Sequence, residues 1–156
     1  MKLKHKEFLD EINSKITQLG IDISKAKLDH IAYQASSSDE YDKLKPQFVK
    51  IAELMKEPIV GGRRVGVFKF SKPLKYKDDS ISAIELIEPK ADQNLKSGLE
   101  HAEYLLPESL EDFMKKYPDI DWDTSALNRN EFPMLILKLN DSMRVKFPRN
   151  PILANN

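Results

Sequence analysis

The sequence predicts an α+β fold in which an N-terminal helix precedes two successive segments, each of one strand, one helix and further strands. Three observations lead to this prediction. Apolar residues near the start of the chain have helical spacing. The order strand, helix, strands occupies residues 28–87, and a shorter version of that order follows residue 99. Because His30 and His101 occupy equivalent places in the two leading strands, the chain is predicted to contain two βαβββ modules.

The length of the chain sets the expected domain organisation. With 156 residues, 40% of them hydrophobic and 32% charged, it has an ordinary globular composition. A chain of this size buries about two thirds of the surface that its unfolded form exposes. We therefore predict a single domain over residues 1–156, with an N-terminal helix and lead-in at 1–26, a first module at 27–90 and a second at 97–150.

Charge and cysteine content exclude several classes of protein. Lys and Arg number 25 and Asp and Glu also number 25, so no net basic charge favours nucleic acid as a partner. The chain has no Cys, which excludes disulfides, thiolate metal ligands and a Cys nucleophile. It begins without an apolar leader and contains no apolar stretch of membrane-spanning length, so no membrane partner is expected. These features together favour a cytoplasmic location.

The N-terminal helix and the first strand are predicted from side-chain periodicity. Gly20 suits the position just after a helix, where a left-handed backbone is common. Residues 28–34 alternate in the manner of a strand. The apolar residues that fall close to one helical face are Leu3, Phe8, Leu9, Ile12, Ile16 and Leu19.

The second helix is predicted from a capping box. Ser37 followed by Glu40 is the pattern in which each of the two side chains accepts a hydrogen bond from a backbone N–H at the helix start. Apolar residues at helical spacing extend the prediction through Ile51 and Leu54. Pro46 interrupts this stretch, so its first part is also compatible with a separate turn.

The rest of the first module is predicted to be strands. Residues 58–70 form a hairpin around Gly61 and Gly62, which can supply a left-handed turn. A lysine-rich loop follows at 71–79, and residues 80–87 form the last strand.

The second module is predicted to follow a polar connector and to end before a loose tail from Pro148. Its expected elements are a strand at 99–105, a helix at 107–116, a weak strand at 121–126 and a hairpin of strands at 133–139 and 143–147.

Alternation along the strands brings chemically active side chains to defined faces. Glu85 has apolar neighbours two residues away on either side, so its carboxylate is predicted to be partly buried. Such a charge is costly unless it is paired or bound to a metal. Lys69 on the neighbouring strand is the ordinary ion-pair alternative, and a single His on an apolar strand, such as His30, is more often a core residue. Glu103 shares one face with His101.

Five stretches of the chain carry a resemblance to a known family: residues 28–31, 60–69, 84–86, 98–103 and 145–147. Together they resemble the YecM family of the vicinal oxygen chelate superfamily, in which two βαβββ modules form a cupped, barrel-like mixed sheet around a divalent metal. The resemblance implies that His30, Glu85 and His101 are metal ligands and that the ion is zinc, iron, manganese or nickel.

The chain departs from the superfamily at one position. The last strand of the second module often supplies a fourth ligand, usually Glu, and alignment of the two module ends places Lys146 there. A protonated Lys cannot ligate a cation. Either the metal keeps three protein ligands and open positions, or Glu103 supplies the fourth.

The resemblance implies a divalent-metal-binding protein that acts on a small-molecule ligand. The expected activity is that of a metal-dependent isomerase, lyase or oxidoreductase on a small oxygen-rich metabolite, with the protein a monomer or homodimer. Glu103 and Lys146 are the candidate catalytic residues, and Arg63, Arg144 and Lys69 the candidate substrate-binding residues. The alternative is a non-catalytic module that binds or sequesters a small molecule, because fold alone does not distinguish the two.

Overall fold

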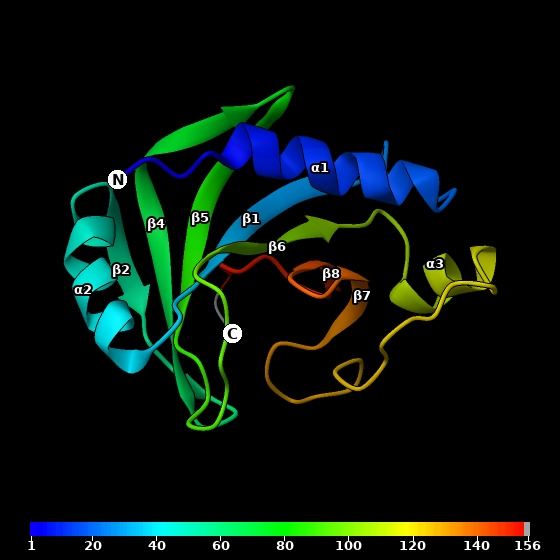
Figure 1. The fold of residues 1–156 in the computed structure, drawn as a ribbon. Coiled ribbons are helices and arrows are strands. Elements are labelled where there is room, and N and C mark those ends of the chain that lie inside the picture. Colours follow the sequence, from blue (N-terminus) through cyan, green and yellow to red (C-terminus); the bar gives the residue numbers. More distant parts are fainter. Residues whose placement is uncertain (155–156) are drawn as a thin grey trace. The chain divides into compact units, whose positions relative to one another are not determined.

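The computed structural model describes residues 1–154, which contain three helices and eight strands (Figure 1). The strands form a mixed sheet that is not closed, and a helix begins the chain, so the predicted α+β class is confirmed. None of the described helices is long and apolar enough to cross a membrane. The elements are α1 His5–Gln18, β1 Lys27–Gln34, α2 Ser38–Val49, β2 Ala52–Lys56, β3 Ile59–Val60, β4 Arg63–Tyr76, β5 Asp79–Ile87, β6 Gly98–Leu105, α3 Leu110–Lys116, β7 Met134–Asn140 and β8 Met143–Pro148.

The chain divides into two compact units, and the first contains residues 1–3 and 30–100. Here β1 pairs parallel with β5, and β5 pairs antiparallel with β4, which also pairs with β2 and β3. Helix α2 covers one face (Figure 1). There the centroid of the Phe48 ring lies 5.8 Å from that of Tyr33 and 5.4 Å from that of Phe68. Because side chains alternate along a strand, His30 and Glu85 emerge on the other face.

The second unit contains residues 4–29 and those from 101 onward. Strand β6 pairs parallel with β8, and β8 pairs antiparallel with β7. Helix α1 packs against β7 and β8, and the α3 residue Phe113 lies 5.0 Å from the Phe147 ring. Asn13 of α1 donates a hydrogen bond to Tyr104 of β6 at 3.4 Å. The helices therefore cover the face that carries Tyr104 and Phe147, and His101 emerges on the opposite face.

The predicted start of α2 and the predicted end of α1 are confirmed. Ser37 Oγ accepts a hydrogen bond from the Glu40 N–H at 3.0 Å, and Glu40 Oε1 accepts one from the Ser36 N–H at 2.9 Å. This reciprocal capping fixes the start of α2. At the end of α1, Gly20 has a φ of 76°, a left-handed conformation that a residue without Cβ adopts without strain.

The predicted extension of the second helix through Ile51 and Leu54 is wrong. Helix α2 accommodates Pro46 but ends at Val49, and β2 begins at Ala52. The Ser71 N–H donates to the Ile51 carbonyl at 2.9 Å, so this stretch is part of the ladder with β4. Pairing with a neighbouring strand outweighs the local helical spacing of the apolar residues.

The predicted lysine-rich loop is also wrong, because β4 continues through it to Tyr76. Leu74 lies opposite Ile81, and Tyr76 lies opposite Asp79 in the antiparallel pairing with β5. Tyr76 is buried, whereas Lys75 is exposed. The lysines of this segment therefore occupy the outer positions of a twisted, irregular strand.

Two expectations for the second unit need correction. The tail from Pro148 is not loose as far as Ile152, which is buried and whose N–H donates to Asp29 Oδ2 at 3.0 Å. The weak strand at 121–126 is reduced to a single bridge between Asp123 and Ile136. In both segments individual contacts to neighbouring strands, rather than regular pairing, hold the backbone in place.

Candidate metal centre

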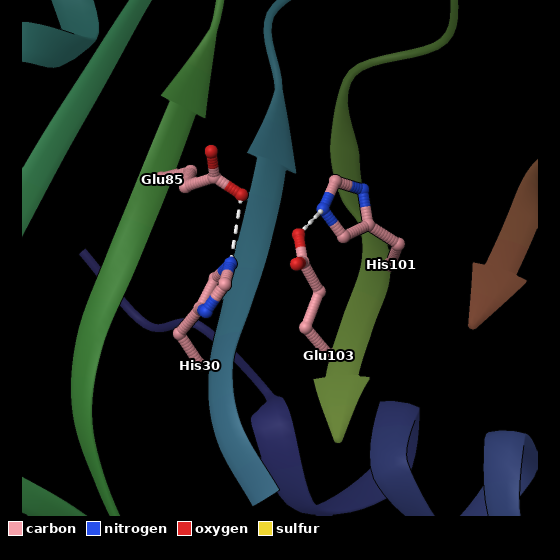
Figure 2. Close-up of side chains that lie close together, drawn as sticks. All are labelled: His30, Glu85, His101 and Glu103. Carbon is pink, nitrogen blue, oxygen red and sulfur yellow. Dashed lines mark hydrogen bonds and ion pairs between the residues drawn. The ribbon is translucent and has the colours of Figure 1, made fainter. Parts of the chain in front are cut away.

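A histidine and a glutamate form a buried pair in the first unit. In the parallel β1–β5 ladder Ala32 lies opposite Glu85, so His30, two residues before Ala32, shares a face with Glu85. His30 Nε2 lies 2.8 Å from Glu85 Oε1 (Figure 2). His30 is 0% exposed and Glu85 is 7% exposed. Neither polar group has full access to water, so their direct contact offsets part of the cost of burial.

The surroundings of Glu85 are apolar. Val67 lies opposite Glu85 in the β4–β5 ladder, and Ile87 follows two residues along the same face. Ile87 packs with Ala32 and Val65 in a buried cluster. In such surroundings the attraction between a carboxylate and a cation is stronger than at the surface.

The structure pairs Glu85 with His30 rather than with Lys69. Lys69 lies opposite Ala83 and its side chain is exposed. The ordinary ion-pair alternative for Glu85 is therefore not observed. Lys69 lies on the same strand face as Val67, and its role as a substrate-binding residue stays a prediction.

A second pair of the same kind lies within β6 of the second unit. His101 and Glu103 are two residues apart and share a face, and His101 Nε2 lies 3.0 Å from Glu103 Oε2 (Figure 2). Their exposed fractions are 1% and 3%. The sequence placed both residues on one face but did not predict their direct contact, because that depends on the rotamers of the two side chains.

His30, Glu85, His101 and Glu103 are the candidate metal-binding group. In both pairs it is Nε2 that faces the carboxylate. With neutral imidazoles the group carries the negative charges of two buried carboxylates, which one divalent cation would balance. Imidazole nitrogen and carboxylate oxygen are donors that suit zinc, iron, manganese and nickel. The donor set therefore fits the expected metals.

Two basic residues lie beside the second pair. In the parallel β6–β8 ladder Arg144 lies opposite His101, and Lys146 lies opposite Glu103. Directly opposite residues in a ladder point to the same face, so all four side chains share it. Arg144 and Lys146 are half-buried. The position predicted to replace a superfamily ligand thus adjoins a residue of the candidate group.

Asp123 is a residue near this face that the sequence analysis did not select. Hydrogen bonds from the hydroxyl and N–H of Ser125, at 2.6 and 2.9 Å, lower the pKa of its carboxyl group, and the charges of Arg144 and Lys146 lower it further. Asp123 lies in the segment predicted as a weak strand, which the structure reduces to a single bridge, so strand alternation was a weak signal for it. The spacing of Asp123 and Ser125, typical of a local side-chain turn, was the available indication.

Arg63 and Arg64, adjacent in sequence, lie on different faces of β4. Arg63, Val65 and Val67 are spaced two residues apart along β4, so Arg63 shares the face of Val67 and Glu85. Arg64 instead donates hydrogen bonds to Glu88 on the other face. The role of Arg63 in substrate binding stays a prediction, and the hydrogen bonds of Arg64 make it part of a structural network.

The fold is similar to those of a solved methylmalonyl-CoA epimerase and a solved Bacillus subtilis dioxygenase. A Streptomyces coelicolor methylmalonyl-CoA epimerase in complex with 2-nitronate-propionyl-CoA aligns with a TM-score of 0.57 and 11% identity, over 83% of this chain and 98% of the other. The solved structural-genomics Protein EC4020 aligns with a TM-score of 0.74 and 24% identity, over 94% of this chain and 84% of that one.

The family follows from the sequence comparison. The YecM protein family model matches residues 1–151, and the chain belongs to this family. Protein YecM of Escherichia coli is 28% identical over 99 residues, which cover 64% of this chain and 51% of that protein. The matched chain spans about half the length of the curated relatives that it resembles.

Proposed function

We propose that this chain is a divalent-metal-binding protein in which His30, Glu85, His101 and Glu103 hold one ion. The observation that carries the proposal is the presence of two buried His–Glu pairs in which the imidazole Nε2 faces a carboxylate oxygen, at 2.8 Å in one pair and 3.0 Å in the other. Two such pairs supply the nitrogen and oxygen donors of a mixed ligand set.

Glu103 decides how many positions on the ion remain open. Its contact with His101 favours a role as the fourth ligand over that of a free general base. Four protein ligands complete a tetrahedral zinc site, whereas they leave two positions on a six-coordinate ion such as manganese. Glu103 as fourth ligand therefore favours a six-coordinate ion in a catalytic protein.

We further propose that the protein is an enzyme of the isomerase, lyase or oxidoreductase type for a small oxygen-rich metabolite. A bound divalent ion supplies Lewis-acid stabilisation of negative charge on substrate oxygens. Lys146, opposite Glu103, would then hold or move a proton at a neighbouring oxygen. Support for a small-molecule ligand comes from the similar fold of the epimerase that binds a CoA ester.

Metal analysis of the purified protein tests the proposal. We expect about one equivalent of metal per chain in protein purified without chelator or nickel resin, because one ion satisfies both carboxylates. His30→Ala and His101→Ala should each lose most of this metal. His5→Ala is the matched control, because it removes the remaining histidine of the chain, in α1.

The ligand assignment fails if His30→Ala and His101→Ala retain as much metal as His5→Ala. Circular dichroism of each variant separates loss of a ligand from loss of the fold. A variant that keeps the parent spectrum and loses metal supports the assignment.

A further inference from the structure

Strand β8 places two cationic side chains beside the second His–Glu pair. Arg144 and Lys146 are two residues apart and lie opposite His101 and Glu103. Their neighbours Val145 and Phe147 are fully buried on the face covered by the helices. The side chains of Arg144 and Lys146 therefore point to the other face, which carries the candidate metal-binding group.

We infer that Arg144 and Lys146 bind the anionic group, a carboxylate or phosphate, of the small molecule that this face accepts. The inference rests on the proposed function and adds the chemical class of the ligand. A guanidinium presents a planar set of donors to two anion oxygens, and an ammonium adds a compact positive charge. Because both side chains are half-buried, water and salt screen them less than surface cations.

Two carboxylates lie near these cations and make contacts of their own. Glu103 contacts His101, and Asp123 accepts two hydrogen bonds from Ser125. The positive charges of Arg144 and Lys146 also act on the Asp123 carboxylate. The same two charges would attract the anionic group of a ligand on this face.

Lys138 is a third cation on this face. Lys138 lies opposite Arg144 in the β7–β8 ladder, but it is exposed and lies 3.5 Å from Asp141. Ile136, opposite Lys146, is apolar. Lys146 lies directly opposite Glu103, so an anion held by Lys146 would lie beside a proposed metal ligand.

Calorimetric titration with malonate and with inorganic phosphate tests the inference on the full chain, both metal-free and metal-loaded. We expect Lys146→Met and Arg144→Met each to weaken the anion affinity by about tenfold, the size expected for loss of one charge-assisted hydrogen bond. Lys115→Met is the matched control, because Lys115 is an exposed residue of α3, which packs on the opposite face. Lys146→Gln and Arg144→Gln replace any Met variant that does not fold.

Equal anion affinities in the parent, the Lys146 and Arg144 variants and Lys115→Met would overturn the inference. So would a metal-loaded parent that binds neither anion, and the proposed metal function would then still stand. A parent that takes up no metal overturns the proposed function, whatever its anion affinity. Loss of affinity confined to the Lys146 and Arg144 variants supports the inference.

Discussion

Lys146 lies opposite Glu103 across the β6–β8 ladder, so a change in its charge acts directly on the second His–Glu pair. We expect Lys146→Glu to tighten metal binding by on the order of tenfold, about 1.4 kcal/mol, because it removes a repelling cation and adds a carboxylate donor. The same substitution should weaken the binding of anions. Competition titration with a metal-sensitive dye measures the first effect.

Lys146→Met separates the two causes, since it removes the cation without adding a ligand. A Lys146→Glu protein that binds metal no tighter than Lys146→Met would mean that the new carboxylate does not ligate. If neither variant differs from the parent, Lys146 acts outside the metal site.

The candidate residues could be selected from the sequence because burial follows strand alternation. The apolar neighbours of Glu85 predicted a buried carboxylate, and Glu85 is only 7% exposed. The pairing of Glu85 with His30 could not be predicted, because it depends on the register of two parallel strands that are distant in sequence. The contact between His101 and Glu103 depends on rotamers, which alternation does not specify.

At the scale of elements, one network joins α2 to the strands of the first unit. The Arg64 backbone N–H donates to Glu88 Oε1 at 2.9 Å, and its Nη2 donates to Glu88 Oε2 at 2.6 Å. Arg64 Nη1 also donates to Asp42 of α2 at 2.8 Å, and its guanidinium lies 4.2 Å from the centre of the Tyr41 ring. Hydrogen bonds from Arg64 lower the pKa of Glu88 from 4.5 to about 2.

This depressed pKa predicts how stability changes in acid. Glu88 contributes its full stabilisation above the unfolded-state pKa, and this is lost as pH falls toward the folded-state pKa of about 2. The parent should exceed Glu88→Gln by about 2 kcal/mol in free energy of unfolding at pH 7, and the difference should shrink between about pH 5 and pH 2. Urea unfolding at several pH values measures it.

Glu53→Gln is the matched control for the acid experiment, because Glu53 is an exposed residue of β2 in the same unit. Its difference from the parent should stay small throughout the pH range. A constant difference between the parent and Glu88→Gln from pH 7 to about pH 2 would exclude the linkage.

The elements that the sequence predicted correctly are those whose signals are local. The Ser37 capping box and the Gly20 stop are fixed within a few residues of the chain. Strand β2 was missed because the helical spacing of its apolar residues is visible in the local sequence. Its pairing with β4 joins residues that are distant in the sequence. The far end of β4 was missed because its lysines resemble a loop until Leu74 and Tyr76 are placed opposite β5.

At the scale of the whole molecule, the four proposed ligands come from segments that are distant in the sequence. His30 lies in β1, Glu85 in β5, and His101 and Glu103 in β6. A metal held by both pairs would stabilise the native state, because ligand binding stabilises all that must be folded to form the site.

This linkage predicts a metal-dependent melting temperature. At a free metal concentration of about one hundred times the Kd, binding adds about 2.7 kcal/mol, which raises the Tm of a chain of this size by roughly 5–10 °C. His30→Ala, in the first unit, and His101→Ala, in the second, should each lose most of this increase, whereas His5→Ala should keep it. Differential scanning calorimetry with and without metal makes the measurement. If only one of the two variants loses the increase, one His–Glu pair holds the ion by itself. If both respond like His5→Ala, the metal binds elsewhere on the chain.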